Sequence, residues 1–254
     1  MITAVDAYKQ AWHAYRANLK PFALNGVVLL LITFLAVGIA VAAAMLPAFG
    51  GMALFGANSN AATVLAIASV AISIAVSIAA ATLQKAFYGV SDDLMEGREV
   101  KPYGFLMHAK HRFWVLAGIA SIQVGIIMLI TVLFVSLPMA MLASSSTGMA
   151  TVLLALGLGI LSIPFIIAAV LLFEPAFPIA IVECTGVFAS IKGGFALIRK
   201  NLKQYLVLSV ISFALDLLNL IPAAQQVVTI PINSTALLIF YRAGREGKPE
   251  KKKR

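Results

Sequence analysis

The sequence predicts an all-α integral membrane protein, a bundle of six membrane-spanning helices. Of its 254 residues, 61% are hydrophobic and 11% are charged, whereas soluble domains contain roughly 45–50% apolar residues. Several stretches without charged residues are long enough to cross a hydrocarbon layer about 30 Å thick, which takes roughly 20 helical residues. The basic residues gather in a few segments that all lie on one side of the membrane if the chain crosses it six times.

The six spans follow from the apolar stretches, taken in order along the chain. They are expected near residues 23–46, 63–83, 113–137, 151–173 or beyond, 205–221 and 223–241. Residues 1–241 then form a single transmembrane domain, and residues 242–254 form a basic cytoplasmic tail. The last span is the weakest, because it is short and contains Pro231 and Asn233. We expect it to be tilted, kinked or partly buried among its neighbours.

The distribution of charge predicts the sidedness. The connections at residues 47–62 and 138–150 and around Pro222 contain no Lys, Arg, Asp or Glu, so they are expected outside the cell. All 19 Lys and Arg residues fall in the N-terminal segment, in residues 84–112, in residues 183–203 or in the tail. By the positive-inside rule, both termini are cytoplasmic and the protein lies in the cell membrane.

An amphipathic stretch occurs twice, each time before an apolar run. "VDAYKQAWHAYRANLKPF" (residues 5–22) and "FASIKGGFALIRKNLKQY" (residues 188–205) match at a constant offset of 183 residues. Their apolar positions alternate three and four residues apart, as on one face of a helix: Val5, Tyr8, Trp12, Tyr15, Leu19 and Phe22, then Phe188, Ile191, Phe195, Ile198, Leu202 and Tyr205. A weaker third copy, "PYGFLMHAKHRFW", precedes the third span. If it is real, the protein consists of three units, each an amphipathic helix followed by a two-span hairpin.

We expect these helices to lie at the membrane surface, with aromatic residues toward the lipid and Lys or Arg toward anionic headgroups. The expected interface residues are Lys9, Trp12, Tyr15, Arg16 and Lys20 in the first copy, and Lys192, Phe195, Arg199 and Lys203 in the second. Two alternatives are open. The helices could pack on each other as a soluble cap, or their apolar stripe could bind a partner protein.

Three segments carry a resemblance to a known group: "SDDLMEGREVKPYGF", "IVECTGVFASIKGGFALIRKNLKQYL" and "TALLIFYRAGR". They resemble prokaryotic multi-pass membrane proteins that include the membrane domain fused to some glycerophosphoryl diester phosphodiesterases. The resemblance implies a six-helix membrane domain in the cytoplasmic membrane of a prokaryote, with a general link to membrane or lipid homeostasis. It implies no phosphodiesterase activity, since that chemistry belongs to a separate soluble barrel.

Polar residues within the apolar runs form the candidate site. Helical spacing puts Asp216 about 16 Å and Glu174 about 13 Å inside the membrane, and puts Gln123 and Asn233 at similar depth. Prolines next to Glu174 and Asn233 break the helices there, as in many transporter sites. The alternatives are a structural polar network, or carboxylates at the membrane interface.

No residues indicate catalysis, a cofactor or a metal site. Nucleophile-elbow, phosphate-loop, zinc-protease and dinucleotide-binding motifs are absent from fitting contexts. His13, His108 and His111 are expected to be solvated or lipid-facing, and the carboxylates of residues 92–99 to form a solvated helix end. Cys184, the single cysteine, is expected to be an ordinary buried or interfacial thiol.

The sequence therefore predicts a non-enzymatic scaffold or a protein that maintains the membrane. Its expected partners are anionic lipid at the cytoplasmic face and an unidentified membrane protein, but no nucleic acid. The alternative function is a small transporter or permease that uses Glu174 and Asp216 as proton or cation sites, supported by Gln123 and Asn233. A common water-accessible cavity that both carboxylates face would favour transport, whereas separate neighbours would favour the scaffold.

Overall fold

The computed structural model describes residues 2–45, 60–136, 138, 149–216 and 222–245, and every regular element in these ranges is helical. The α-helices are α1 (Ala4–Ala17), α2 (Leu19–Met45), α4 (Asn60–Lys85), α5 (Phe87–Met95), α6 (Gly104–Thr131), α8 (Met149–Phe173), α9 (Ala176–Val182), α10 (Val187–Lys200), α11 (Leu202–Asp216), α12 (Pro222–Ala224) and α13 (Ile230–Arg245). Two π-helical turns, η2 (Val132–Ser136) and η4 (Gln225–Thr229), complete the set.

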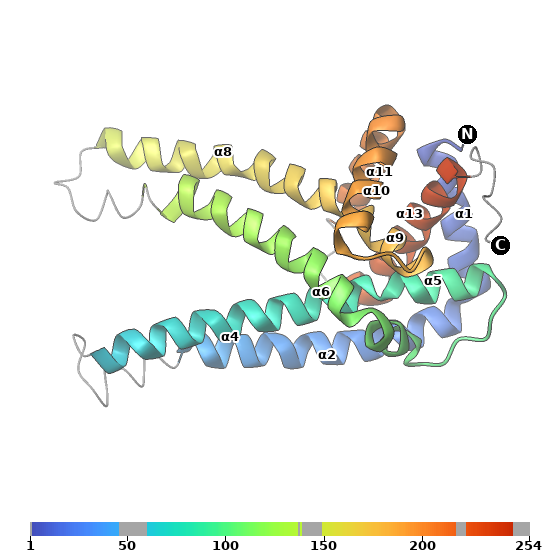
Figure 1. The fold of residues 1–254 in the computed structure, drawn as a ribbon, viewed down its shortest axis with the longest axis horizontal. Coiled ribbons are helices and arrows are strands. Elements are labelled where there is room, and N and C mark those ends of the chain that lie inside the picture. The colour runs from blue at the N-terminus through green and yellow to red at the C-terminus, as the bar shows by residue number, and fades with distance from the viewer. Residues whose placement is uncertain (1, 46–59, 137, 139–148, 217–221, 246–254) are drawn as a thin grey trace.

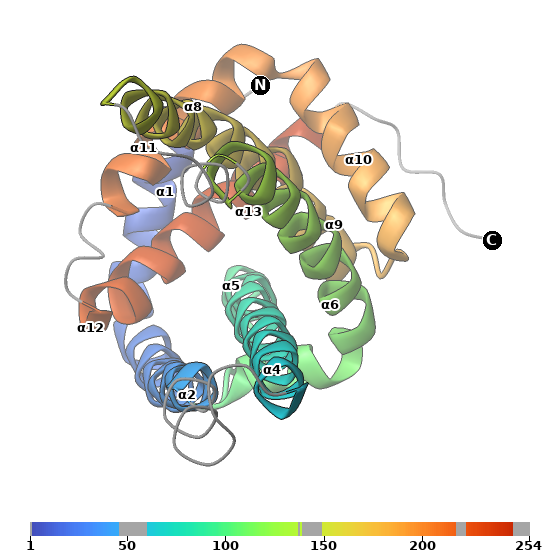
Figure 2. The same cartoon turned by 90° about the vertical axis from the view of Figure 1, so that its left-hand side faces the viewer.

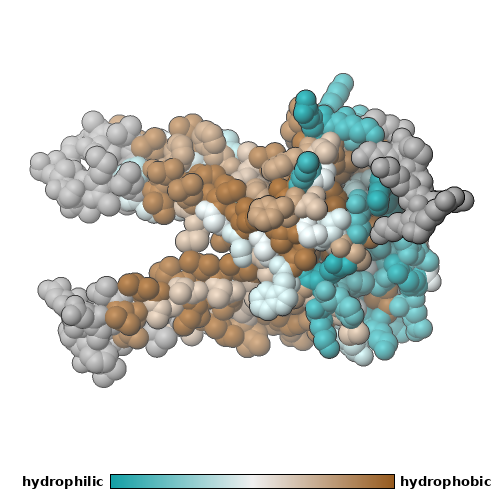
Figure 3. Space-filling view, viewed as in Figure 1, coloured by the Kyte–Doolittle hydropathy of each residue, from teal (hydrophilic) through white to brown (hydrophobic). Residues whose placement is uncertain are grey.

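Four long helices project from a group of shorter ones (Figure 1). The pairs α2–α4 and α6–α8 form two arms that point the same way, and we call the shorter helices α1, α5, α9, α10, α11 and α13 the head. Hydrophobic residues cover both arms, whereas hydrophilic residues gather on the head, and a hollow separates the arms (Figure 3). This separation is typical of arms that sit in lipid and a head that reaches water.

Five helical stretches are long and apolar enough to cross a membrane, so the chain is a multi-pass membrane protein. They are Leu19–Ala42, Ile67–Met95, Gly104–Ser136, Leu156–Val182 and Gln225–Arg245. The predicted bundle of six spans is not confirmed. At the fifth predicted span, α11 contains 15 residues, fewer than the roughly 20 that a bilayer requires, and residues 217–221 lie outside the described residues.

The last of these five stretches differs from the other four. In Gln225–Arg245, 61% of the apolar window is buried inside the protein, against 11–17% in the other four. α13 is therefore the core helix of the head, in contact with α1, α5 and α9. Of the three expectations for this segment (tilted, kinked or partly buried), partial burial among its neighbours is the one that this value supports.

The weak third copy of the amphipathic stretch is not a separate helix. Residues 104–131 form one continuous helix, α6, because no Pro or Gly interrupts the segment where the predicted span begins at residue 113. The described residues therefore do not contain three units that each begin with a separate amphipathic helix.

The other two copies fold alike. α1 and α10 both contain 14 residues, and each ends at an asparagine that starts a second helix, Asn18 before α2 and Asn201 before α11. The Asn18 Nδ2 donates to the Ala14 carbonyl at 3.0 Å, which satisfies a terminal helix acceptor. The bond from the Ala4 amide to Gln204 Oε1, at 3.1 Å, ties α1 to the second copy.

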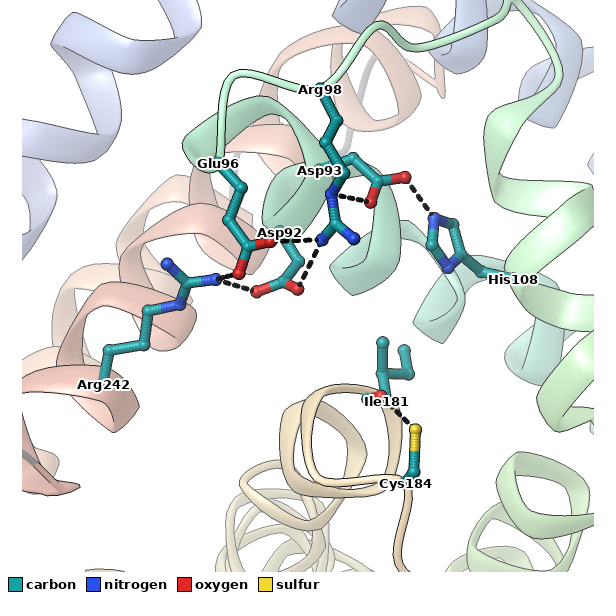
Figure 4. A network of polar contacts seen from close by, with 8 residues as sticks. All are labelled: Asp92, Asp93, Glu96, Arg98, His108, Ile181, Cys184 and Arg242. Atoms are coloured by element: carbon teal, nitrogen blue, oxygen red, sulfur yellow. Dashed lines mark hydrogen bonds and ion pairs between the residues drawn. The ribbon is translucent and has the colours of Figure 1, made fainter. Parts of the chain in front are cut away.

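Ion pairs hold the far end of the head together (Figure 4). Arg242 of α13 bonds Asp92 at 2.5 Å and Glu96 at 2.8 Å, and Arg98 approaches Asp92, at 3.3 Å, and Asp93, at 3.0 Å. The expectation of a solvated helix end at residues 92–99 was wrong for Asp92, which is buried. Within the predicted tail, α13 continues to Arg245, and residues 246–254 lie outside the described residues.

Candidate functional site

Two helix breaks bring a charge pair together where the arms meet the head. α4 ends at Lys85, just before α5, and α8 ends just before Glu174. Lys85 Nζ lies 2.7 Å from Glu174 Oε1 and 2.6 Å from Oε2, and the Tyr88 hydroxyl donates to Oε1 at 2.5 Å. The Lys85 ammonium also lies 5.3 Å from the centre of the Phe177 ring. The side chains of Lys85 and Glu174 are 24% and 21% exposed, so the pair is largely removed from water.

The second break has a simple chemical cause. Pro175 has no backbone N–H, so the Leu171 carbonyl lacks the donor that a continuous helix would place four residues later. The Tyr205 hydroxyl of α11 supplies that donor at 2.5 Å. The sequence thus breaks the helix after α8, and a side chain from another element satisfies the carbonyl that the break leaves.

A second polar group comes from three helices of the head. The Tyr8 hydroxyl of α1 donates to Asn233 Oδ1 at 2.9 Å, and Asn233 Nδ2 donates to Asp216 Oδ1 at 3.2 Å. Burial raises the pKa of the Tyr8 hydroxyl above its ordinary value, so Tyr8 stays a protonated donor. The amide of Asn233 therefore presents its N–H to the carboxylate of Asp216.

Residues of both groups, Lys85, Tyr88 and Glu174 of the first and Asp216 and Asn233 of the second, line one cavity of about 580 Å³, within the range of small-molecule sites. We call it the polar cavity. Its lining residues come from α4, α5, α8, α11, η4 and α13 and from the α8–α9 connection, and Figure 2 views these helices along the arms. Its polar lining consists of Gln84, Lys85, Tyr88, Glu174, Ser209, Ser212, Asp216, Gln225, Asn233 and Ser234. Its apolar lining consists of Ile166, Ile167, Val170, Leu171, Leu206, Val210, Phe213 and Ile230.

The structure brings three of the four predicted site residues together. Glu174, Asp216 and Asn233 line the polar cavity, whereas Gln123 does not. Gln123 is buried between α6 and α8, where its Nε2 lies 3.5 Å from the Val170 carbonyl. The sequence alone could not tell whether the Gln123 amide packs between two helices or lines a cavity, because polar residues in apolar runs do both.

The expected depth near the bilayer centre needs correction for Glu174. That count assumed a helix running without a break from Glu174 to residue 183, but α8 ends at Phe173. α8 contains 25 residues and is about 37 Å long at 1.5 Å per residue. It spans a hydrocarbon layer of about 30 Å by itself. Glu174 therefore lies where the arm joins the head.

Sequence reasoning missed Lys85, Tyr88 and Tyr8 as members of this site. The sequence analysis grouped Lys85 with the cytoplasmic basic residues that follow the second span. In the structure, the apolar stretch continues past Lys85 through α5 to Met95. The signal was present in "QKAFYGV", where apolar residues follow the lysine. Tyr8 counted only as part of an amphipathic stripe, although its hydroxyl needed a partner if buried.

The predicted interface residues fall into two groups. Tyr15 is 5% exposed and packs inside the protein, so it is not free to contact lipid. The others are exposed: Lys9, Trp12, Arg16, Lys20, Lys192, Phe195, Arg199 and Lys203. On α10, Phe188 is 81% exposed, whereas α1 packs against α13. The cap interpretation thus fits α1 better, and the surface interpretation fits α10 better.

The histidines and the cysteine are not among the residues that line the polar cavity. His108 Nε2 is 2.6 Å from Asp93 Oδ2, so this histidine has a carboxylate partner rather than only solvent. Cys184 is exposed. Among the residues that the structure describes, no three His, Cys, Asp or Glu residues are grouped as metal ligands would be.

Comparison with known proteins gives no match: no family model, no curated protein and no solved structure matches this chain. The resemblance to the phosphodiesterase-associated membrane domains therefore stays a prediction.

Proposed function

We propose that this protein is a small transporter or permease whose substrate site is the polar cavity. The observation that carries the proposal is that Glu174, between α8 and α9, and Asp216, at the end of α11, line the same cavity of about 580 Å³. A cavity with charged and apolar walls suits a bound solute.

The helix breaks around the cavity support movement as well as binding. Glu174 lies between α8 and α9, and Asn233 lies just after the change from the π-helical η4 to α13. π-helical turns and broken helices are frequent at functional sites, because they hold polar backbone groups where a ligand can reach them.

Cysteine accessibility tests the proposal without a known substrate. Ser212 lines the cavity, so Ser212→Cys is made in a Cys184→Ser background and treated with a charged, impermeant methanethiosulfonate reagent. A transporter exposes its site to each side in turn, so the reagent should modify the cysteine from either face. The matched control is Thr82→Cys, which is buried outside the cavity. Modification of Ser212→Cys from one face only, or from neither, would exclude a translocation path.

A second candidate function is the surface scaffold, supported by one observation on α10. Phe188 and Phe195 are 81% and 41% exposed on a helix that also exposes Lys192 and Arg199. Such a face suits the headgroup layer of an anionic membrane. In phosphatidylglycerol liposomes, Phe188→Glu with Phe195→Glu should make α10 more sensitive to trypsin. Unchanged protection would argue against this role.

A further inference from the structure

We infer that the polar cavity binds a glycolipid, a membrane lipid with an uncharged headgroup rich in hydroxyl groups, and that this lipid enters between α8 and α11. The inference rests on the proposed function and specifies its substrate class. It follows from three properties of the cavity: the polar side chains that are free to bind, the apolar residues at its mouth, and its level in the membrane.

The charged side chains of the cavity already have partners within the protein. Lys85 Nζ contacts both carboxylate oxygens of Glu174, at 2.7 and 2.6 Å, and the Tyr88 hydroxyl donates to the same carboxylate. Asp216 accepts a hydrogen bond from Asn233 at 3.2 Å, has a further interaction, and lies exposed at the end of α11. Because these charges are engaged, the ligand need not supply an ionic partner.

Three neutral side chains of the lining are free to bind a ligand. Gln84, Gln225 and Ser234 line the cavity, and their side chains make no hydrogen bond to any other residue that the structure describes. Each of these amides and hydroxyls can both donate and accept. The hydroxyl groups of a sugar have the same double capacity, whereas a phosphodiester only accepts and an ammonium only donates. The free groups therefore match an uncharged, hydroxyl-bearing headgroup.

Apolar residues form the mouth of the cavity. Ile167 of α8 and Leu206, Val210 and Phe213 of α11 line the cavity and are nonetheless 37%, 51%, 68% and 53% exposed. α11 packs mainly against α1, α10 and η4, so these apolar residues stay uncovered next to α8, which belongs to a membrane-spanning stretch. Such a surface meets acyl chains. A lipid would cover it, whereas a water-soluble sugar would leave it bare.

The polar and apolar parts of the cavity lie at the levels that a lipid requires. Glu174 directly follows α8, a helix of bilayer length, so the polar lining lies near headgroup level. Ile167 lies about 10 Å before Glu174 along α8, at 1.5 Å per residue, and so lies beside the hydrocarbon. A lipid in the cavity would have its headgroup at the first level and its chains at the second.

Native mass spectrometry of the full-length protein, released from dodecyldimethylamine oxide micelles, measures the bound lipid directly. Three lipids with the same dioctanoyl chains are compared at equal free concentration: the glucosyl lipid has hydroxyl groups and no charge, phosphatidylglycerol has hydroxyl groups and a phosphate, and phosphatidylcholine has charges and no hydroxyl group. We expect the glucosyl lipid to bind about tenfold more tightly than phosphatidylcholine, with phosphatidylglycerol between them. Free glucose, which lacks the chains, should not displace the glucosyl lipid at the same concentration.

A double variant tests the headgroup contacts. Gln84→Leu with Gln225→Leu removes both free amides and nearly keeps the side-chain size. It should weaken binding of the glucosyl lipid about tenfold and leave phosphatidylcholine unchanged, a selective loss that general misfolding cannot produce. The control Gln10→Leu removes an exposed amide on α1, outside the cavity, and should change neither affinity.

A matched pair of variants tests the mouth. Val210→Trp narrows the opening between α8 and α11 and should weaken binding of all three lipids about tenfold. The control Val207→Trp places the same ring at a valine of α11 that is 39% exposed and does not line the cavity. It should leave lipid binding unchanged.

The outcomes distinguish this inference from the proposed function. Equal binding of the glucosyl lipid and phosphatidylcholine, or tighter binding of phosphatidylglycerol, would overturn the inference and leave transport of another class of solute. Displacement by free glucose, or unchanged lipid binding in Val210→Trp, would overturn it in the same way. Access to Ser212→Cys from one face only, with binding of the glucosyl lipid intact, would overturn transport and leave a lipid-binding site.

Discussion

The Lys85–Glu174 pair should contribute measurably to stability, and the structure sets the size of the effect. Removing one partner of a fully buried pair costs about 3–5 kcal/mol. Because the two side chains are 24% and 21% exposed, we expect Glu174→Gln to cost about 2–3 kcal/mol. The variant leaves the Lys85 ammonium with the Phe177 ring, 5.3 Å away, in place of a carboxylate. The Tyr88 hydroxyl keeps only a weaker, neutral acceptor.

The assay is thermal unfolding in detergent, followed by the intrinsic fluorescence of Trp12 and Trp114. A loss of 2–3 kcal/mol corresponds to a fall in Tm of about 5–10 °C for a protein of this size. The double variant Lys85→Gln/Glu174→Gln should be more stable than Glu174→Gln alone, because it leaves no unpaired charge. The control Arg245→Gln breaks a pair whose arginine is 53% exposed and should cost less than about 1 kcal/mol.

Two results would refute this reasoning. One is a Tm of Glu174→Gln within about 1 °C of the unaltered protein, which would mean that water screens the pair fully. The other is strict additivity in the double variant, which would mean that the two charges do not interact in the folded state.

Three further predictions concern other contacts. Gly89→Ala should lower the free energy of unfolding by about 1–3 kcal/mol, because a Cβ there would lie 2.2 Å from the His108 ring. The control Gly125→Ala should not lower it, because a Cβ there would meet no neighbouring atom within 4 Å. Asn25→Ala should cost about 2–3 kcal/mol, because this fully buried amide bonds three backbone groups; a change below 0.5 kcal/mol would contradict this. An impermeant maleimide should label Cys184, the exposed single cysteine, in inverted vesicles and not in intact cells; the opposite pattern would reverse the predicted sidedness.

The arms could be predicted from the sequence because one physical requirement determines them. In lipid, a spanning segment needs about 20 apolar residues with internal hydrogen bonds, and hydropathy reports this directly. The predicted spans at residues 23–46 and 151–173 correspond closely to α2 and α8. The predicted outer connections fall largely on residues 46–59, 139–148 and 217–221, outside the described residues.

The head was harder to predict because tertiary contacts decide it. Nothing in the stripe of residues 5–22 tells whether an apolar face meets lipid or α13, since both environments select the same residue types. The last predicted span, residues 223–241, is ambiguous in the same way, because its apolar composition fits both a membrane span and a buried core helix. Of the candidate site, Glu174, Asp216 and Asn233 were found because polar residues in apolar runs stand out.

The helix breaks explain why binding groups gather where the arms meet the head. Each break leaves backbone carbonyls without a helical donor, and in an apolar surrounding these must find partners. Tyr205 provides one for the Leu171 carbonyl. Polar side chains gather at the same place, where the Tyr88 hydroxyl donates to Glu174 Oε1. Tyr205→Phe removes the donor to the Leu171 carbonyl and should lower the free energy of unfolding by about 1–2 kcal/mol in the thermal assay, whereas Leu161→Ala, at a position that is 50% exposed, should lower it by less than about 0.5 kcal/mol.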